Sequence, residues 1–384
     1  MQGSSAPYDP AVARPEPALI ALAAGRIPPD FDLTPGLVDS AIEHRMEGLL
    51  YSWAAEAGKL GDEGGIALSV VETRNWARNR MLASQAVKLE ANAAEHGVEI
   101  CFFKGVTLEA QVYGRTGERP STDLDVMVRN GTVGDVAGWV ASLQPRHMWI
   151  PRLEELIEGR HIQAIDLVVN GVQVDLHFDP LKLEIVRARS REDLLVRTVA
   201  CEIDTGTVTA LDAEANLVLA LLHLNKDRFR RLIGYSDVRR LVGQVDDWDW
   251  LVRYVEAEGL TTPVLSTLGV VARTLDFPHP AALDIPPPRR MWKLAWPERS
   301  RLLGRPGLVR YRYRQMLLPM FSSGRWAEGI AGALRRLFPP PPMLRAFYPT
   351  QRGPYLQVLL FGRVIRRVQR ARQRNAVRDE DHTD

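Results

Sequence analysis

The chain contains few cysteines and no long apolar run, and each absence excludes a class of protein. Its two cysteines, Cys101 and Cys201, lie far apart and lack the Cys-x-x-Cys spacing of zinc and redox motifs. A disulfide scaffold is therefore excluded, and a reduced, cytoplasmic environment is expected. No apolar stretch approaches the roughly 20 residues that a membrane-spanning helix requires. The opening residues also lack the charged and apolar segments of a signal peptide.

The net charge is small but unevenly distributed. The whole chain carries +2, whereas residues 285–384 contain 21 Lys and Arg against 6 Asp and Glu. This last segment therefore carries about +15, and residues 1–284 carry about −13. The length of 384 residues suffices for two or three domains with sizeable cores. The pattern predicts a helical region over 1–96, a core over 97–210, a helical domain over 211–284 and a basic Arg/Pro-rich region over 285–384.

The first part of the chain reads as a series of helices. Apolar residues recur at helical spacing over 18–25, 36–58 and 67–96, with a loop predicted over 61–65. The third helix is the longest, and His96-Gly97 ends it. We expect its large side chains, Trp76 and Met81, to pack in the core.

The residues from Val98 to Val128 combine an apolar run, a glycine turn and paired acids. Glu99 to Phe103 predicts a strand, and Lys104-Gly105 predicts a turn into a short helix over Thr107 to Tyr113. Such a turn gathers backbone N–H groups at a helix N-terminus, where a phosphate group can bind. The turn is therefore a candidate phosphate site.

A second strand is predicted immediately after this helix, because apolar and acidic residues alternate from Asp123 to Val128. Alternation sends Asp123 and Asp125 to one face of the strand and the apolar side chains to the other. Two carboxylates about 7 Å apart on one face repel each other, and a divalent metal bound through oxygen would relieve the repulsion. An Asp-x-Asp pair alone is weak evidence, but Lys104 and Arg119 lie close in sequence and suit a metal-bound triphosphate.

A hairpin is predicted where two alternating runs flank Asn170-Gly171. A two-residue turn sets the register, so Asp166 should lie across from Asp175, and Ala164 across from His177. Like charges directly opposite each other destabilise a sheet unless a cation or solvent screens them. The hairpin therefore supplies further candidate acids beside the first pair.

These motifs together resemble the uncharacterised nucleotidyltransferase family, which belongs to the DNA polymerase β-like nucleotidyltransferase superfamily. The resemblance lies in Lys104-Gly105, Tyr113, Arg119 and the Asp123-Leu124-Asp125-Val126 run. It extends over roughly Gly36 to Tyr348, although the specific motifs are confined to 104–125 and 175–177. The superfamily signature has a Ser after the Gly, where this chain has Val106.

The resemblance implies a metal-dependent transfer of a nucleoside monophosphate, with Mg²⁺ or Mn²⁺ as cofactor and ATP as the expected substrate. It implies that Asp123, Asp125 and Asp175 hold the metal ions. Lys104 and the Gly105 amide would contact phosphate, and Arg119 would contact phosphate or brace the acidic strand. Asp166 is the second choice for the third acid. His177 is either a hydrogen-bonded strand histidine or part of the site.

The pattern becomes helical again from Ala213, with Asp212 as N-cap. His223 and Lys226 share one face of this helix, and Asp237 follows at a position that resembles the family's acidic residue. Our first interpretation is that His223 and Asp237 tie two helices together. The alternative is that these residues line the nucleotide or acceptor cleft.

The last segment, residues 355–374, reads as a basic amphipathic helix. It could pack on the protein, lie on an anionic membrane surface at the inner side of the membrane, or contact nucleic acid, in that order of preference. A small molecule or peptide is the favoured acceptor. Two other functions remain open: a nucleotide-binding accessory protein without turnover, and an RNA-acting nucleotidyltransferase.

The fold class expected from all these patterns is α/β. A small mixed sheet should carry the Lys-Gly turn and the three acids, with helical regions before and after it.

Overall fold

The computed structural model describes residues 15–26, 32–61, 63–145, 152–181, 188–227 and 229–278, with a few isolated positions beyond. Within these residues the strands are β1 (Glu99–Phe103), β2 (Asp123–Asn130), β3 (Ala164–Val169), β4 (Val172–His177), β5 (Thr198–Ile203) and β6 (Gly206–Leu211). They form one sheet in the order β3-β4-β2-β1-β6-β5. β2 is antiparallel to β1 and parallel to β4, so the sheet is mixed, as predicted.

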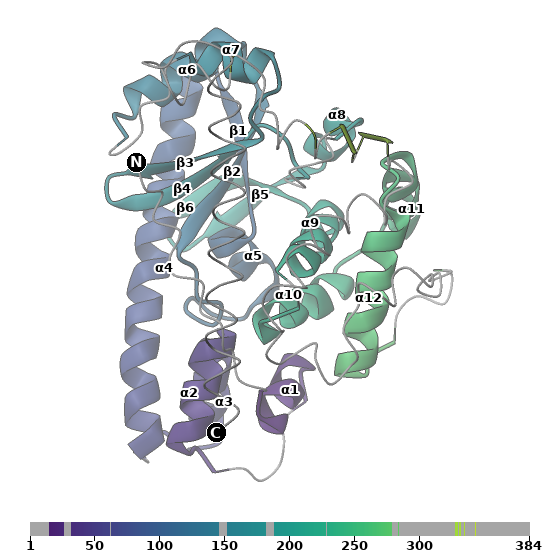
Figure 1. Ribbon diagram of the computed structural model, residues 1–384. Helices are drawn as coiled ribbons and strands as arrows, with labels where there is room; N and C mark the ends of the chain where they lie inside the picture. Colours follow the sequence, from purple (N-terminus) through teal and green to yellow (C-terminus); the bar gives the residue numbers. More distant parts are fainter. Residues whose placement is uncertain are drawn as a thin grey trace, which may run out of the picture.

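Helices cover both faces of this sheet (Figure 1). The helices are α1 (Pro17–Ala23), α2 (Pro35–His44), α3 (Glu47–Glu56), α4 (Glu63–Glu95), α5 (Gly105–Val112), α6 (Val133–Ser142), α7 (Leu153–Glu158), α8 (Arg191–Leu195), α9 (Ala213–Lys226), α10 (Leu232–Val242), α11 (Trp248–Ala257) and α12 (Thr261–Leu275). The α/β fold class predicted from the sequence is confirmed.

The sheet separates two apolar cores. On one face, Leu124 and Val126 pack with Leu82 of α4 and Trp139 of α6. On the other face, Phe103 and Met127 join a larger core built from α1–α3 and α9–α12. The acidic side of β2 therefore faces the layer formed by the first and last described helices, and the site must lie between the sheet and that layer.

The N-terminal helices differ from the prediction at two points. Residues 36–58 form two helices rather than one, because Arg45 adopts a left-handed conformation (φ 56°) that ends α2. The loop predicted over 61–65 is wrong in its second half, since α4 begins at Glu63. The glycines there suggest a loop, but Gly64 and Gly65 are buried against backbone atoms of Leu33 and Leu60.

The prediction that Trp76 and Met81 pack in the core is wrong. Their exposed fractions are 40% and 50%. α4 lies along the outer edge of the molecule, so one side of it faces solvent (Figure 1). The buried side of α4 includes polar Asn75 and Asn79 beside its leucines and alanines, and the two amides donate to the carboxylates of Glu47 and Glu109.

The hairpin register predicted from Asn170-Gly171 is confirmed. Val169 lies across from Val172, Leu167 across from Val174, and Asp166 across from Asp175. Asn170 and Gly171 have φ of 51° and 82°, as a turn with two left-handed residues requires. The second hairpin, β5–β6, was not predicted. It extends the sheet beyond β1 through a long-range parallel contact between Phe102 and Ala210.

We expect Gly171→Ala to lower the free energy of unfolding by roughly 1–2 kcal/mol, because a Cβ is disfavoured at positive φ. Urea unfolding measures this effect. Gly138→Ala is the matched control, since Gly138 lies inside α6 with open space around it. That change should be neutral or stabilising by up to about 1 kcal/mol. Equal losses in both variants would contradict the turn argument.

None of the described helices is long and apolar enough to cross a membrane. The basic amphipathic helix predicted over 355–374 lies outside the described residues.

Candidate functional site

The pairing of β2 with β4 brings together acids from distant parts of the chain. Asp125 lies across from Asp175, which in turn lies across from Asp166 on β3. The side chains of Asp125 and Asp175 are only 14% and 11% exposed. Asp166 is exposed at the edge of the sheet. The strand order therefore produces a partly buried acidic pair with a solvent-facing neighbour.

His177 completes this arrangement, because it follows Asp175 by two positions and so occupies the same face of β4. Its Nε2 atom lies 3.3 Å from Asp175 Oδ2 and 3.5 Å from Asp125 Oδ1. The imidazole is 1% exposed and meets the ring of Phe103 edge to face at 5.0 Å. Neither ring nitrogen has a hydrogen bond of good geometry among the described residues.

The donor set of Asp125, Asp175 and His177 suits a divalent cation. One ligand atom from each lies within 4.8 Å of the others. The two carboxylates supply the oxygen ligands that Mg²⁺ and Mn²⁺ prefer, and the buried imidazole adds one nitrogen donor beside them. Asp123 lies outside this trio, at the start of β2, where its Oδ1 accepts a hydrogen bond from Thr122.

The two acids of the Asp-x-Asp motif differ in electrostatics. Burial, followed by the charge of Asp125, raises the pKa of Asp123. Burial alone would also raise the pKa of Asp125, but Lys104 and His177 outweigh it and hold that pKa well below its usual range. Asp125 is therefore ionised at neutral pH, as a metal ligand must be.

Lys104 lies beside the acids at the turn between β1 and α5. Its Nζ is 3.1 Å from Nδ1 of His223, and Nε2 of His223 is 3.1 Å from Oδ2 of Asp227. The lysine backbone has φ of 55°, and its N–H donates to Asn216 Oδ1 at 3.4 Å.

The sequence prediction missed Asp227, although its i+4 spacing from His223 on α9 was visible. Burial would raise the pKa of Asp227, but the interactions with His223, followed by the charges of Lys104 and Lys226, hold that pKa below its usual range. Lys226 is exposed on the same helix.

Arg119 and Asp237 form a buried pair behind the site. The guanidinium donates from Nε and Nη2 to both carboxylate oxygens, at 2.8 and 2.9 Å. The Tyr113 hydroxyl donates to Oδ1 of Asp237 at 2.7 Å. In this geometry Arg119 ties the loop before β2 to α10, which corresponds to the bracing role. Contact of Arg119 with phosphate stays a prediction.

Among the described residues, no hydrogen bond or ion pair links His223 directly to Asp237. They belong to separate networks, one at Lys104 and one at Arg119.

The turn at Gly105 lacks the Ser of the superfamily signature, but a hydroxyl from another segment lies near it. Val106 is buried in the core behind the sheet. Gly105 has φ of 47°, and a Cβ placed on it would lie 3.8 Å from Ser121 Oγ. A hydroxyl therefore approaches the turn from the loop before β2. Ser121 was not identified from the sequence, because it is distant from Gly105 along the chain.

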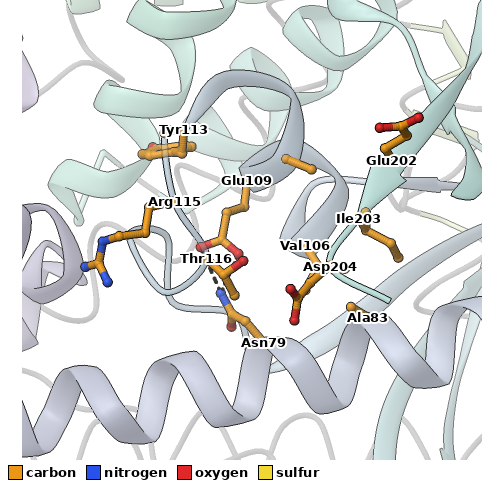
Figure 2. A pocket seen from close by; sticks show the side chains of 12 residues that line it. Asn79, Ala83, Val106, Glu109, Tyr113, Arg115, Thr116, Glu202, Ile203 and Asp204 are labelled. Atoms are coloured by element: carbon orange, nitrogen blue, oxygen red, sulfur yellow. Dashed lines mark hydrogen bonds between the residues drawn. The ribbon is translucent and has the colours of Figure 1, made fainter. Parts of the chain in front are cut away.

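A pocket of about 210 Å³ is lined by residues of α4, of α5 with the loop that follows it, and of the end of β5, and it does not include the acids of β2 and β4 (Figure 2). Its lining includes Asn79, Glu109, Arg115 and Asp204. Figure 2 shows Glu109 turned toward Asn79, and the Glu109 carboxylate also accepts from the backbone N–H of Arg119 at 3.0 Å. These contacts hold the loop that leads to β2, so Asn79 and Glu109 of this pocket support the site.

Comparison with solved structures gives a partial overlap. A solution structure of the antibiotic-resistance factor ANT(2'')-Ia matches with 14% identity and a TM-score of 0.33, covering 46% of this chain and 91% of that chain. We draw no functional argument from an overlap of this size. No curated protein matches the chain.

The sequence profile of the uncharacterised nucleotidyltransferases matches residues 34–276, which is more than half of the chain and includes the Lys-Gly turn, the acids of β2 and β4, and His223. This agrees with the motif resemblance and supports transferase activity. The chain belongs to the uncharacterised nucleotidyltransferase family.

Proposed function

We propose that this protein transfers a nucleoside monophosphate, with AMP from ATP as the expected case, to a hydroxyl or phosphate acceptor. The observation that carries the proposal is the cluster of Asp125, Asp175 and His177 in a member of a nucleotidyltransferase family. A small molecule or peptide is the acceptor class we favour.

The acids and the imidazole would hold Mg²⁺ or Mn²⁺, with Asp123 beside them as a further ligand. When bound, such an ion lowers the pKa of an attacking hydroxyl and neutralises charge on the leaving pyrophosphate. Asp125 is kept ionised for this role by Lys104 and His177, which outweigh the effect of burial. Burial of the pair also limits water at the point where the metal would bind.

Lys104 would bind the phosphates, because the turn presents its ammonium beside the acids at the start of α5. His223 and Asp227 would limit the movement of that ammonium through the contacts at 3.1 Å. Phosphoryl transfer needs mainly positioning and charge stabilisation, which these fixed groups supply. The Gly105 amide would add a donor at the helix N-terminus.

The test is thermal stability with ATP, CTP, GTP and UTP, each with and without Mg²⁺ or Mn²⁺. A ligand that binds only the folded state raises the melting temperature by mass action. We expect one triphosphate to stabilise the protein only with metal, and the Asp123→Asn/Asp125→Asn variant to lose that response. Absence of any shift at millimolar nucleotide would count against the proposal.

We expect Lys104→Gln to raise KM for the triphosphate by roughly 10- to 100-fold, since a charged hydrogen bond contributes about 1.5–3 kcal/mol. Steady-state kinetics at saturating metal measures it. Lys88→Gln is the control, because Lys88 is an exposed lysine on α4. An unchanged KM in Lys104→Gln would remove Lys104 from the nucleotide site.

A nucleotide-binding accessory role is the second candidate, and Val106 in place of Ser is the observation that favours it. Stabilisation by nucleotide without release of pyrophosphate, across a panel of small-molecule and peptide acceptors, would support this alternative.

A further inference from the structure

A second group of basic side chains lies on the Asp123 side of the site, and the proposed function does not use it. Arg45 stands at the corner between α2 and α3, half-buried, with its backbone in the left-handed region. The backbone at the start of α3 packs closely against the loop that leads to β2. A Cβ added to Gly48 would lie only 2.1 Å from the carbonyl oxygen of Gly117. This contact brings Arg45 close to Arg119 and to the start of β2.

Arg231 reaches the same region from α10. It is the N-cap residue of that helix, whose Asp237 holds Arg119 through two hydrogen bonds. Burial, then the charges of Arg231 and Arg119, lower the pKa of Arg45, whereas the carboxylate of Asp123 opposes this. Three guanidinium groups from distant parts of the chain therefore converge beside Asp123.

These arginines differ in how far their charges are already compensated. The guanidinium of Arg119 already donates two hydrogen bonds to the carboxylate of Asp237. Among the described residues, neither Arg45 nor Arg231 forms an ion pair. Glu47, two residues after Arg45, is buried and accepts a hydrogen bond from Asn75 at 3.1 Å. Burial raises the pKa of Glu47, and the charges of Arg45 and Arg231 partly oppose that rise. Arg45 and Arg231 thus share the one buried carboxylate of Glu47 without pairing directly with it, which leaves their N–H donors for an external anion.

The positive charge around the acids is therefore split between two sides. The ammonium of Lys104 acts on Asp125, whereas the guanidinium of Arg45 acts on Asp123. As a metal ligand, Asp123 would no longer offset the charge of Arg45, which would leave Arg45 and Arg231 available to an anion. Guanidinium groups match phosphate and carboxylate oxygens through paired hydrogen bonds.

We propose that Arg45 and Arg231 bind an anionic group, a phosphate or a carboxylate, on the acceptor substrate. This inference rests on the proposed function, because it assigns the triphosphate to the Lys104 side. It narrows the acceptor class to molecules that carry a negative charge near the hydroxyl or phosphate that is modified.

The experiment is a titration with inorganic phosphate and, separately, with acetate, read by thermal shift without metal or nucleotide. We expect phosphate, acetate or both to stabilise the wild type, and the responding anion identifies the group. Arg231→Gln and Arg45→Lys should weaken the apparent affinity for it about tenfold or more. Arg231 is exposed, so Arg231→Gln should fold. Arg45→Lys keeps the positive charge but loses the paired N–H donors of the guanidinium. Arg253→Gln, an exposed arginine on α11, is the matched control and should respond like wild type.

A parallel titration with Mg²⁺ and ATP separates this inference from the proposed function. We expect the arginine variants to keep the ATP response and Lys104→Gln to keep the anion response. Loss of the ATP response together with the anion response would place the arginines in the triphosphate site and overturn the inference. Absence of an anion response in the wild type would overturn it as well. Absence of an ATP response in the wild type would count against the proposed function instead.

Discussion

Replacing Asp125 by Asn should reduce metal-dependent turnover by roughly 1,000-fold or more, which corresponds to about 4 kcal/mol of transition-state stabilisation. Asp125 belongs to the cluster that could hold a metal, and its ionised form is favoured by Lys104 and His177 over the effect of burial. An amide of the same shape removes the charge and leaves the strand pairing unchanged. Pyrophosphate release under saturating nucleotide measures the loss, and circular dichroism checks the fold.

Asp166→Asn is the matched control, because Asp166 lies across from Asp175 on the same face but is exposed. This variant should lose little activity. An equal loss in Asp166→Asn would show that the metal site extends to β3. Full activity in Asp125→Asn would remove this acid from the reaction.

Asp123, unlike Asp125, should make the metal-free protein less stable at neutral pH. Because the folded pKa of Asp123 is raised, the folded state binds the proton more tightly than the unfolded state. Stability from this group is therefore present at low pH and is lost as pH rises from the ordinary Asp range through the raised pKa. Asp123→Asn removes this loss, so the variant should melt a few degrees higher than wild type at neutral pH.

The largest effect on stability should come from the buried pair of Arg119 and Asp237. Their side chains are 12% and 7% exposed, and removal of one partner leaves the other charge buried without its partner. Asp237→Ala should therefore lower the free energy of unfolding by about 3–5 kcal/mol. It also removes the acceptor of the Tyr113 hydroxyl. Denaturant unfolding measures the change.

A double-mutant cycle with Arg119→Met distinguishes pairing from packing. The double variant should lose much less than the sum of the single variants, because no uncompensated charge remains. The exposed pair of Arg26 and Asp276, at 3.2 Å, is the control. Arg26→Ala should cost at most about 1 kcal/mol. Additive losses at Arg119 and Asp237 would contradict the pairing argument.

Much of the site was predictable because its signals are local. The turn at Lys104-Gly105, the strand that carries Asp123 and Asp125, and the hairpin register at Asn170-Gly171 each depend on residues adjacent in the chain. Short-range backbone preferences and the two-residue period of a strand determine such features without reference to the rest of the fold. The family resemblance depended on the same motifs, and the family profile confirms it.

The partners of these groups could not be predicted, because they come from distant segments. Asp227 beside His223, Ser121 beside Gly105, and the convergence of Arg45 with Arg231 all depend on how the helical layer packs on the sheet. The exposure of Met81 likewise depends on which side of α4 remains uncovered. The sequence by itself determined which acids share a strand face and which family the chain belongs to. Only the tertiary structure decided which charges surround those acids, because the helices that supply the charges are positioned by nonlocal packing.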